Sequence, residues 1–387
     1  MEVKQIYSLL NTVSGEVLGK SDIIQEDLTG LVDMGNEVLN QNAVDNYVKS
    51  LVNHIGKVVF VNRPYSGKVP SVLMDAWEFG SVLEKVTADM PQATENDSWN
   101  LTDGTEYKQD VFHKPVVTAK FFNSKVTFEV PISITERQVK ESFSSAEQVN
   151  GFLSMIYNAV DKSMTIKTDA LIMRTINNMI AETFNADAAT FNGDFTAHST
   201  VRCVNLLYLW NQAHGTDLTA QEAVMNPDFI RYASYQMGLY ADRLQSISTL
   251  FNVGGKDRFT PKDALHVVLL SDFAKAAQTF LYADTYHSEQ VLLPNAETVA
   301  SWQASGDDYS FVKTSAIDVK TSSTGAEVKV SGILGVMFDR DALGVCNSDK
   351  RVTTNYNAKA EFFNNWFKFD ASYFNDTNEN FVVFYVA

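Results

Sequence analysis

The chain has 387 residues, of which 45% are hydrophobic and 20% charged, and this composition is typical of a folded globular protein. The 47 Asp and Glu residues outnumber the 31 Lys and Arg residues, and the net charge of −16 argues against broad binding to nucleic acids or anionic membranes. The length allows two or three compact lobes.

The cysteine content and the apolar runs exclude further classes of protein. Cys203 and Cys346 are far apart and form no Cys-x-x-Cys motif, so the sequence predicts neither a disulfide framework nor a zinc site, and a reducing cytosol fits. No apolar run approaches the ~18 residues of a membrane span, and the residues after Met1 do not resemble a signal peptide. Three glycosylation sequons therefore carry no meaning: Asn96, Asn100 and Asn375.

The first third of the chain changes from helical to β character. Residues 1 to about 55 show helical spacing in short pieces, and we expect this segment to lie on another part of the protein. The firmest strands that follow are predicted at Val58–Val61 and Val126–Ile132. Between them, Met90–Glu106 is polar and long enough to stand away from the body, either as a functional loop or as a flexible surface loop of a monomer.

A single long helix is predicted from Ser145 to about Phe184. Ser144 and Glu147 have the spacing of a capping box at its start. Apolar residues then follow in three- and four-residue steps, and neither Pro nor Gly interrupts the run for many turns after Gly151. At 1.5 Å per residue this helix is ~60 Å long, and its apolar stripe is broader than a coiled-coil seam.

The middle of the chain mixes helices with short buried strands. Asn226 is predicted to cap a helix that begins at Pro227 and runs toward Phe251, with a break at the following glycine pair. Ala264–Leu270 predicts an interior strand, and a capped helix is expected directly after it. Trp302–Val330 is rich in turn residues and is interpreted as a connecting route.

The chain closes on a dense aromatic and asparagine-rich segment with four blocks: Ile333–Val345, Thr354–Lys359, Phe362–Phe374 and Glu379–Ala387. In the second and third blocks polar and apolar residues alternate, which predicts strands with one buried face. Phe381–Ala387 is nearly all apolar and predicts a central strand covered on both faces. Four residues of the long helix are expected to face these strands: Ile156, Val160, Ile172 and Ile176.

The closing segment resembles that of tailed-phage major capsid proteins with the Hong Kong 97 fold. The shared features, in order, are a buried strand, the Asp339-Arg-Asp turn, the Thr354-x-Tyr-Asn strand, the Asp370-Ala-x-Tyr strand end and the final Glu379-Asn strand. The long helix, preceded by the Ile132-Ser-Ile-Thr strand, is similar to the spine helix of that family. The specific part of the resemblance covers the closing segment and Val126–Ile156.

The resemblance implies a mixed α+β fold with the parts of the family. These are an N-terminal arm (1–57), an E-loop region (58–125), a peripheral domain with the spine helix (126–200), an axial domain (201–330) and return strands of the peripheral domain (331–387). The E-loop is an extended hairpin, expected at about 65–115 with its tip near Gln92–Glu106. The arm reaches toward a neighbouring subunit, and the axial domain surrounds a five- or six-fold axis.

The function implied by the resemblance is assembly and not catalysis. The chain would form pentamers and hexamers of an icosahedral shell around double-stranded DNA, assembled in the bacterial cytoplasm and kept in the virion. Its partners would be further copies of itself, a portal, a separate scaffolding protein and packaged DNA bound without sequence specificity, with no membrane. Two alternatives stay open, an encapsulin-like bacterial nanocompartment and an acidic enzyme.

The sequence predicts no catalytic, metal or cofactor-binding residues. Gly15–Ser21 has three residues between its glycines where a phosphate loop needs four. His266, inside an apolar strand, is interpreted as a hydrogen-bonded core residue, and Asp339 and Asp341 are interpreted as parts of a capped turn around Arg340. None of the six histidines stands three or four residues from another: His54, His113, His198, His214, His266 and His287.

Overall fold

The computed structural model describes residues 11–12, 14–16, 18–19, 67, 69–74, 83–135, 146–282, 296–303 and 308–387. The chain divides into two compact units. One comprises 1–65, 131–162 and 354–365, and the other comprises 66–130, 163–353 and 366–387. The predicted strand Val58–Val61, the capping residue Ser144, the side chain of Glu147 and most of the predicted arm lie outside the described residues.

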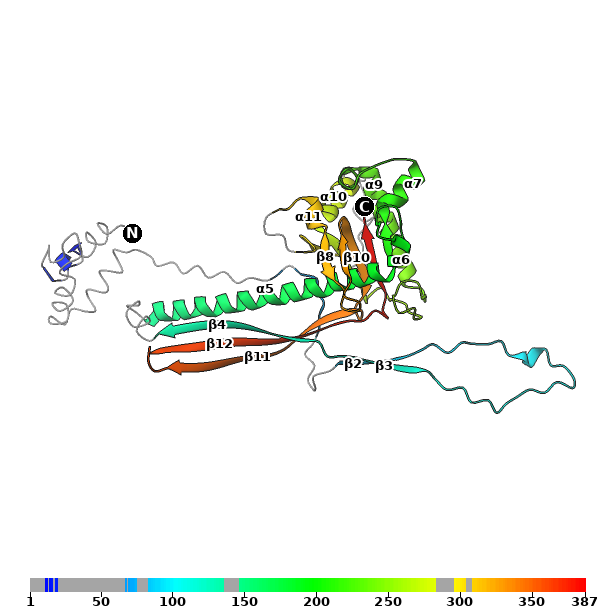
Figure 1. Ribbon diagram of the computed structural model, residues 1–387, viewed down its shortest axis with the longest axis horizontal. Helices are drawn as coiled ribbons and strands as arrows, with labels where there is room; N and C mark the ends of the chain where they lie inside the picture. Colours follow the sequence, from blue (N-terminus) through cyan, green and yellow to red (C-terminus); the bar gives the residue numbers. More distant parts are fainter. Residues whose placement is uncertain are drawn as a thin grey trace. The chain divides into compact units, whose positions relative to one another are not determined.

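The predicted long helix is confirmed as α5, which spans Ala146–Ala186 and has 41 residues (Figure 1). Ile172 and Ile176 are fully buried and Val160 nearly so, whereas Ile156 is half-buried. Three buried threonines interrupt the apolar stripe, and each hydroxyl donates to the carbonyl four residues earlier: Thr168 to Met164, Thr175 to Leu171 and Thr183 to Met179. These bonds satisfy the hydroxyls inside the helix, so the stripe remains compatible with burial.

A five-stranded sheet forms the core of the larger unit, in the order β5-β13-β10-β6-β7. The strands are β5 (Cys203–Asn205), β6 (Leu265–Leu270), β7 (Ala296–Val299), β10 (Ile333–Asp339) and β13 (Phe381–Tyr385). All five residues of β13 are buried, and the strand pairs parallel with β5 and antiparallel with β10. The prediction of a central strand covered on both faces is confirmed.

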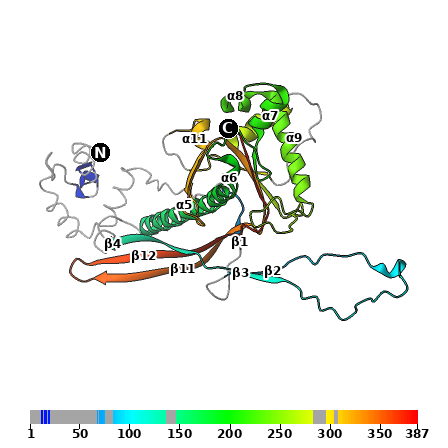
Figure 2. The same cartoon turned by 45° about the vertical axis from the view of Figure 1, so that its right-hand side comes forward.

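Four helices pack with this sheet: α7 (Leu206–His214), α8 (Ala220–Met225), α9 (Pro227–Leu244) and α10 (Ser271–Tyr282). A short helix, α6 (Ala188–Phe191), follows α5. Residues of α7, α8, α9 and α10 share one apolar cluster with the strands (Figure 2). Asn226 caps α9 as predicted, because its side chain accepts from the amides of Asp228 and Phe229. The helix ends at Leu244 and not near Phe251, because the amide of Thr260 donates to the Leu244 carbonyl at 2.7 Å.

The stretch Trp302–Val330 is more regular than the predicted connecting route. It contains α11 (Phe311–Thr314) and an antiparallel hairpin of β8 (Ile317–Lys320) and β9 (Glu327–Val330). Trp302 is 1% exposed, and its indole donates to the carbonyl of Ile333 at 2.9 Å. The many turn residues hid this structure because the two strands have only four residues each.

A four-stranded sheet has the order β1-β11-β12-β4, built from β1 (Leu73–Met74), β4 (Lys125–Thr135), β11 (Leu343–Asn357) and β12 (Phe362–Asn375). The strand predicted at Val126–Ile132 is therefore confirmed. The predicted return segment 331–387 is divided, because β11 and β12 belong to this sheet while β10 and β13 belong to the five-stranded one.

The alternation of polar and apolar residues in the closing segment predicted strands with one buried face. This prediction is wrong for part of the segment. Residues 351–361 are exposed on both faces within the described part of the chain, residues 362–368 are partly buried, and the first buried residue of β12 is Phe369. The polar-apolar alternation shows which side chains can be covered, and no described residue covers these. A turn around Arg340 does form as predicted, with the amide of Asp341 donating to the Asp339 carboxylate at 2.9 Å.

Candidate assembly surfaces

A β-hairpin carries the most exposed part of the described chain. Strands β2 (Leu83–Ala88) and β3 (Val117–Phe122) pair antiparallel over six residues, from Leu83 opposite Phe122 to Ala88 opposite Val117. The pairing continues past the predicted limit of residue 115. The segment between the two strands forms a long open loop with one short 3₁₀ turn, η1 (Asp97–Trp99) (Figures 1 and 2).

Every residue from 90 to 119 is exposed in the described structure. Trp99 is 94% exposed and Phe112 is 86% exposed, and six further apolar residues accompany them: Met90, Leu101, Tyr107, Val111, Val116 and Val117. The hydrogen bonds of this tip are local, for example from the Thr102 amide to the Tyr107 hydroxyl at 2.9 Å. Large apolar side chains gathered on one exposed segment mark an interaction surface.

The tip is also acidic. Residues 90–116 contain five carboxylates and two lysines, a net charge of −3 with histidine neutral. An isolated extended segment of this kind buries too little apolar surface to offset the entropy of ordering it. The contacts that would order the tip are therefore expected to come from another molecule.

The base of the hairpin, in contrast, is tied to the body by ion pairs. Lys85 of β2 and Lys120 of β3 both contact the carboxylate of Asp376, at 3.0 and 2.9 Å. Glu379 accepts from Lys85 at 2.7 Å and from Arg258 at 3.3 Å. Both carboxylates lie in the turn between β12 and β13, so the hairpin is anchored to the turn that leads into β13 of the five-stranded sheet.

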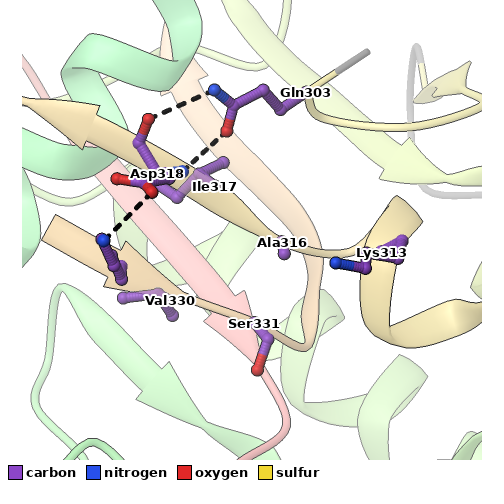
Figure 3. Close-up of a pocket in the computed structure, with 8 residues that line it drawn as sticks. Gln303, Lys313, Ala316, Ile317, Asp318, Val330 and Ser331 are labelled. Carbon is purple, nitrogen blue, oxygen red and sulfur yellow. Dashed lines mark hydrogen bonds and ion pairs between the residues drawn. The ribbon is translucent and has the colours of Figure 1, made fainter. Parts of the chain in front are cut away.

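Two recesses lie on the larger unit. A groove of about 810 Å³ between α8, α10 and α11 is lined mainly by apolar atoms, including those of Met225, Phe280, Tyr309 and Phe311. Figure 3 shows a smaller recess beside the β8–β9 hairpin, where the Gln303 amide exchanges two hydrogen bonds with the backbone of Asp318. In this recess Lys329 also pairs with the Asp318 carboxylate at 3.3 Å, so the bonds around Asp318 join the loop at Gln303 to the β8–β9 hairpin.

The exposed end of the β11–β12 pair offers a further surface. Its strands are linked by the side chains of Thr354 and Asn365, at 2.9 Å. Tyr356 and Phe363 lie against each other with ring centroids 4.7 Å apart, although Tyr356 is 47% exposed. Two strands that pair well and leave both faces open can accept a covering partner.

No reaction centre appears among the described residues. These contain no group of three or more His, Cys, Asp or Glu side chains that could hold a metal ion. His266 is half-buried and stacks on Phe338 at 5.5 Å, and the structure records no side-chain hydrogen bond for it, contrary to the prediction. Burial raises the pKa of the Cys203 thiol well above its usual range, so this side chain packs as a neutral group.

The remaining residues named from the sequence are equally inert. Cys346 is a buried thiol, and the Asp339 carboxylate serves the turn described above. Much of the Gly15–Ser21 segment, and His54 and His287, lie outside the described residues. No helix within the part of the chain that the structure describes is long and apolar enough to span a membrane. The distinctive features of the described residues are therefore their exposed surfaces. Of these surfaces, the sequence predicted only the hairpin tip.

Comparisons with known proteins give these surfaces a context. The profile of the Phi29-like phage major capsid protein family matches residues 8–385. No curated protein is significantly similar to the chain. A solved structure of the head fibre and inner core protein of native bacteriophage P68 has 9% identity and a TM-score of 0.51, covering 86% of this chain and 88% of that one.

Two other solved structures are also similar to the chain. The capsid of Staphylococcus phage Andhra has 11% identity and a TM-score of 0.48, covering 86% of this chain and 89% of that one. The capsid of cyanophage P-SCSP1u has 11% identity and a TM-score of 0.46, with coverages of 87% and 96%. Neither the nanocompartment nor the enzyme alternative is supported. The match over nearly the whole length shows that this chain belongs to the Phi29-like phage major capsid protein family, so it is a non-enzymatic shell protein of the virion.

Proposed function

We propose that the chain forms the pentamers and hexamers of an icosahedral shell around double-stranded DNA, and that the β2–β3 hairpin is its E-loop. In this proposal the hairpin tip docks on a neighbouring subunit. The observation that carries it is the full exposure of residues 90–119, with Trp99 and Phe112 almost free of contacts. A monomer gains nothing from presenting these rings to water, whereas a shell can cover them in every subunit.

The energies involved are sufficient for assembly. Fully burying an aromatic side chain contributes roughly 1.5–3 kcal/mol, so Trp99 and Phe112 together can contribute several kcal/mol per subunit. The net charge of −16 per subunit opposes association at long range. Apolar contacts of short range are therefore the expected driving force for closure.

Deletion of Gln92–Glu106 tests the proposal. If the tip serves only contacts between subunits, the shortened chain will fold with an unchanged thermal midpoint but will remain as soluble subunits. Size-exclusion chromatography and negative-stain images of the purified protein would report both results. Normal closed particles from the deletion variant would contradict the assignment of the tip.

The domain division that we propose follows the family with one change. The arm comprises 1–57 and the E-loop region 58–125, while 126–200 contributes the spine helix and β4 to the peripheral domain. We assign β11 and β12 to the peripheral domain as well. The axial domain comprises 201–330 together with β10 and β13, since these two strands lie in the same sheet as β5, β6 and β7.

The family relationship also supports three further partners: a portal, a separate scaffolding protein and packaged DNA. The acidic charge of the subunit favours DNA contact that is weak and independent of sequence. Sequencing of DNA crosslinked to the shell in filled particles tests this last partner. A uniform distribution over the genome is expected, and enrichment of one sequence motif would contradict it.

A further inference from the structure

Two lysines occupy directly opposite positions on the paired strands of the hairpin. In the antiparallel register of β2 and β3, Lys85 faces Lys120. Paired residues point to the same face of a hairpin, and like charges in this arrangement repel. An anion close to both ammonium groups offsets this repulsion.

The carboxylate of Asp376 supplies that anion. One of its oxygens lies 3.0 Å from the Lys85 ammonium, and the other lies 2.9 Å from the Lys120 ammonium. The side chain of Asp376 is only 2% exposed, whereas those of Lys85 and Lys120 are 19% and 39% exposed. A single buried carboxylate therefore bridges the two strands of the hairpin at its base.

The position of Asp376 is fixed by hydrogen bonds of its backbone and of its carboxylate. Its amide donates to the Ala342 carbonyl at 2.6 Å, and its carbonyl accepts from the Glu379 amide at 3.2 Å. Its carboxylate also accepts from the Asn378 amide at 3.1 Å. The anion is thus part of a rigid turn, and a hairpin that is bound to it takes its direction from that turn.

The surrounding charges reinforce this geometry. Lys85 also donates to Glu379 at 2.7 Å and to the Asp341 carbonyl at 3.1 Å. Arg258 contacts the same oxygen of Glu379, at 3.3 Å. Three cations and two carboxylates therefore face one another, and the group brings together the hairpin, the turn before β13 and the loop after α9.

Two further contacts hold the hairpin on either side of this group. The Phe122 ring at the end of β3 packs on Phe374 of β12, with centroids 5.2 Å apart. Beyond the lysines, Lys256 binds both carboxylate oxygens of Asp89, at 3.0 and 2.9 Å. The Phe122–Phe374 contact has no fixed direction, so the hairpin can pivot about it. The ion pairs of Lys85 and Lys120 restrict this pivoting because they hold both strands.

We propose that Asp376 is a positioning residue that sets the direction in which the hairpin leaves the subunit body, by bridging the opposed Lys85 and Lys120. This goes beyond the docking of the tip, because it concerns how an unassembled subunit presents the tip. The tip lies up to about 46 Å from Lys85 for a chain extended at 3.3 Å per residue, so a rotation of about 10° at the base moves it about 8 Å. Such a displacement is enough to lose a specific apolar contact.

Distances between two spin labels on the full-length chain, kept dispersed as subunits, test the proposal. One label replaces the exposed Val117 of the hairpin and the other replaces the exposed Asp242 of α9, while Cys203 and Cys346 are buried. The unmodified background is expected to give one narrow distance distribution. Asp376→Asn keeps the side-chain volume and the bond from the Asn378 amide but removes the charge, and should broaden the distribution at least twofold.

Two controls separate positioning from a general loss of stability. Asp103→Asn makes the same charge change at the exposed tip and should leave the distribution narrow. Adding Lys120→Met to Asp376→Asn removes the cation that Asp376→Asn leaves unpaired, and the distribution should stay broad because the bridge is still absent. If this second substitution narrows the distribution, repulsion between the lysines and not the loss of the bridge caused the broadening, and the proposal is wrong; it is also wrong if Asp376→Asn leaves the distribution narrow.

A second variant keeps the test valid if Asp376→Asn does not fold. The single substitution Lys120→Met cuts the bridge to β3, while Asp376 stays paired with Lys85 and so keeps a cation beside its buried carboxylate. This variant should fold with a broad distance distribution. A narrow distribution would show that the ion pairs do not direct the hairpin.

Discussion

Strand β13 and the tip of the β2–β3 hairpin show opposite solutions to the burial of apolar side chains. The five residues of β13 are completely buried by the chain itself. Residues 90–119 are all exposed, although they include Trp99 and Phe112. The comparison teaches that the chain itself buries one part of this capsid subunit, while another part is expected to be covered only by further copies.

The position of the boundary between these two regions is informative. The hairpin base carries a charged cluster, and charges buried as compensated pairs specify geometry more than they add stability. The subunit thus combines an apolar core, an ionic joint and an uncovered tip. Substitutions in the core are expected to impair folding, and substitutions at the tip are expected to impair assembly. Substitutions in the ionic joint are expected to change the orientation of the hairpin.

The largest effect is expected in the core, from Ile172→Asp in α5. Ile172 is fully buried, so the new carboxylate would be unpaired and would destabilise the fold by roughly 3–5 kcal/mol. Insoluble protein is the expected result in an expression and fractionation assay. Ile166→Asp on the same helix is the control, because Ile166 is 47% exposed and should tolerate the change. A soluble Ile172→Asp protein that assembles would mean that the stripe is not core.

At the tip, the double substitution Trp99→Ser and Phe112→Ser should leave folding unchanged and impair assembly. Losing two buried aromatic side chains costs about 3–6 kcal/mol per contact, which raises the critical concentration for assembly by on the order of 100-fold or more. Light scattering against protein concentration measures this. Gln92→Ser with Gln109→Ser is the matched polar control, and an equal effect in the control would remove the apolar explanation.

The ionic joint should respond to pH only at the extremes. Burial favours a higher pKa for Asp376, but the hydrogen bond from Lys120 and the charge of Lys85 outweigh it and hold the pKa below the ordinary value of 3.8. A depressed carboxylate pKa stabilises the folded arrangement above about pH 3.9, and this contribution is lost as the pH falls through the folded pKa. The folded carboxylate stays ionised down to its own lowered pKa, so the label distances should broaden only below pH 3.8.

On the alkaline side the sign reverses. Burial favours a lower pKa for Lys85, but its bond to Glu379 and the charge of Asp376 raise the pKa above 10.5. The stabilisation by the charged Lys85 ammonium is present below pH 10.5 and is lost as the pH rises through the folded pKa. The distribution should stay narrow from about pH 4 to 10.5. If the distance distribution of the unmodified chain broadens near neutral pH, the lowered pKa of Asp376 and the raised pKa of Lys85 are both contradicted.

The smallest effect is expected from salt. Raising the ionic strength from about 10 to about 150 mM shortens the Debye length from ~30 to ~8 Å, which screens the repulsion between subunits of charge −16. Assembly followed by light scattering should become faster. Particles that dissolve as salt is added would show instead that ion pairs between subunits dominate.

Several features of the fold followed from the sequence because they depend on neighbours a few residues apart. The extent of α5 follows from its uninterrupted apolar spacing, and the start of α9 follows from Asn226 and Pro227. The burial of β13 follows from its apolar run. The resemblance to capsid proteins in the closing segment also led to the correct family.

Other features were decided only by the tertiary structure. Leu73 pairs with Val345, and Lys85 and Lys120 meet Asp376, across separations of hundreds of residues that no local pattern encodes. The division of the closing segment between two sheets, and the open faces of residues 351–361, depend on which surfaces the rest of the chain covers. Periodicity records what can be buried, whereas burial itself is a property of the whole chain, and for the hairpin tip we expect it to be a property of the shell.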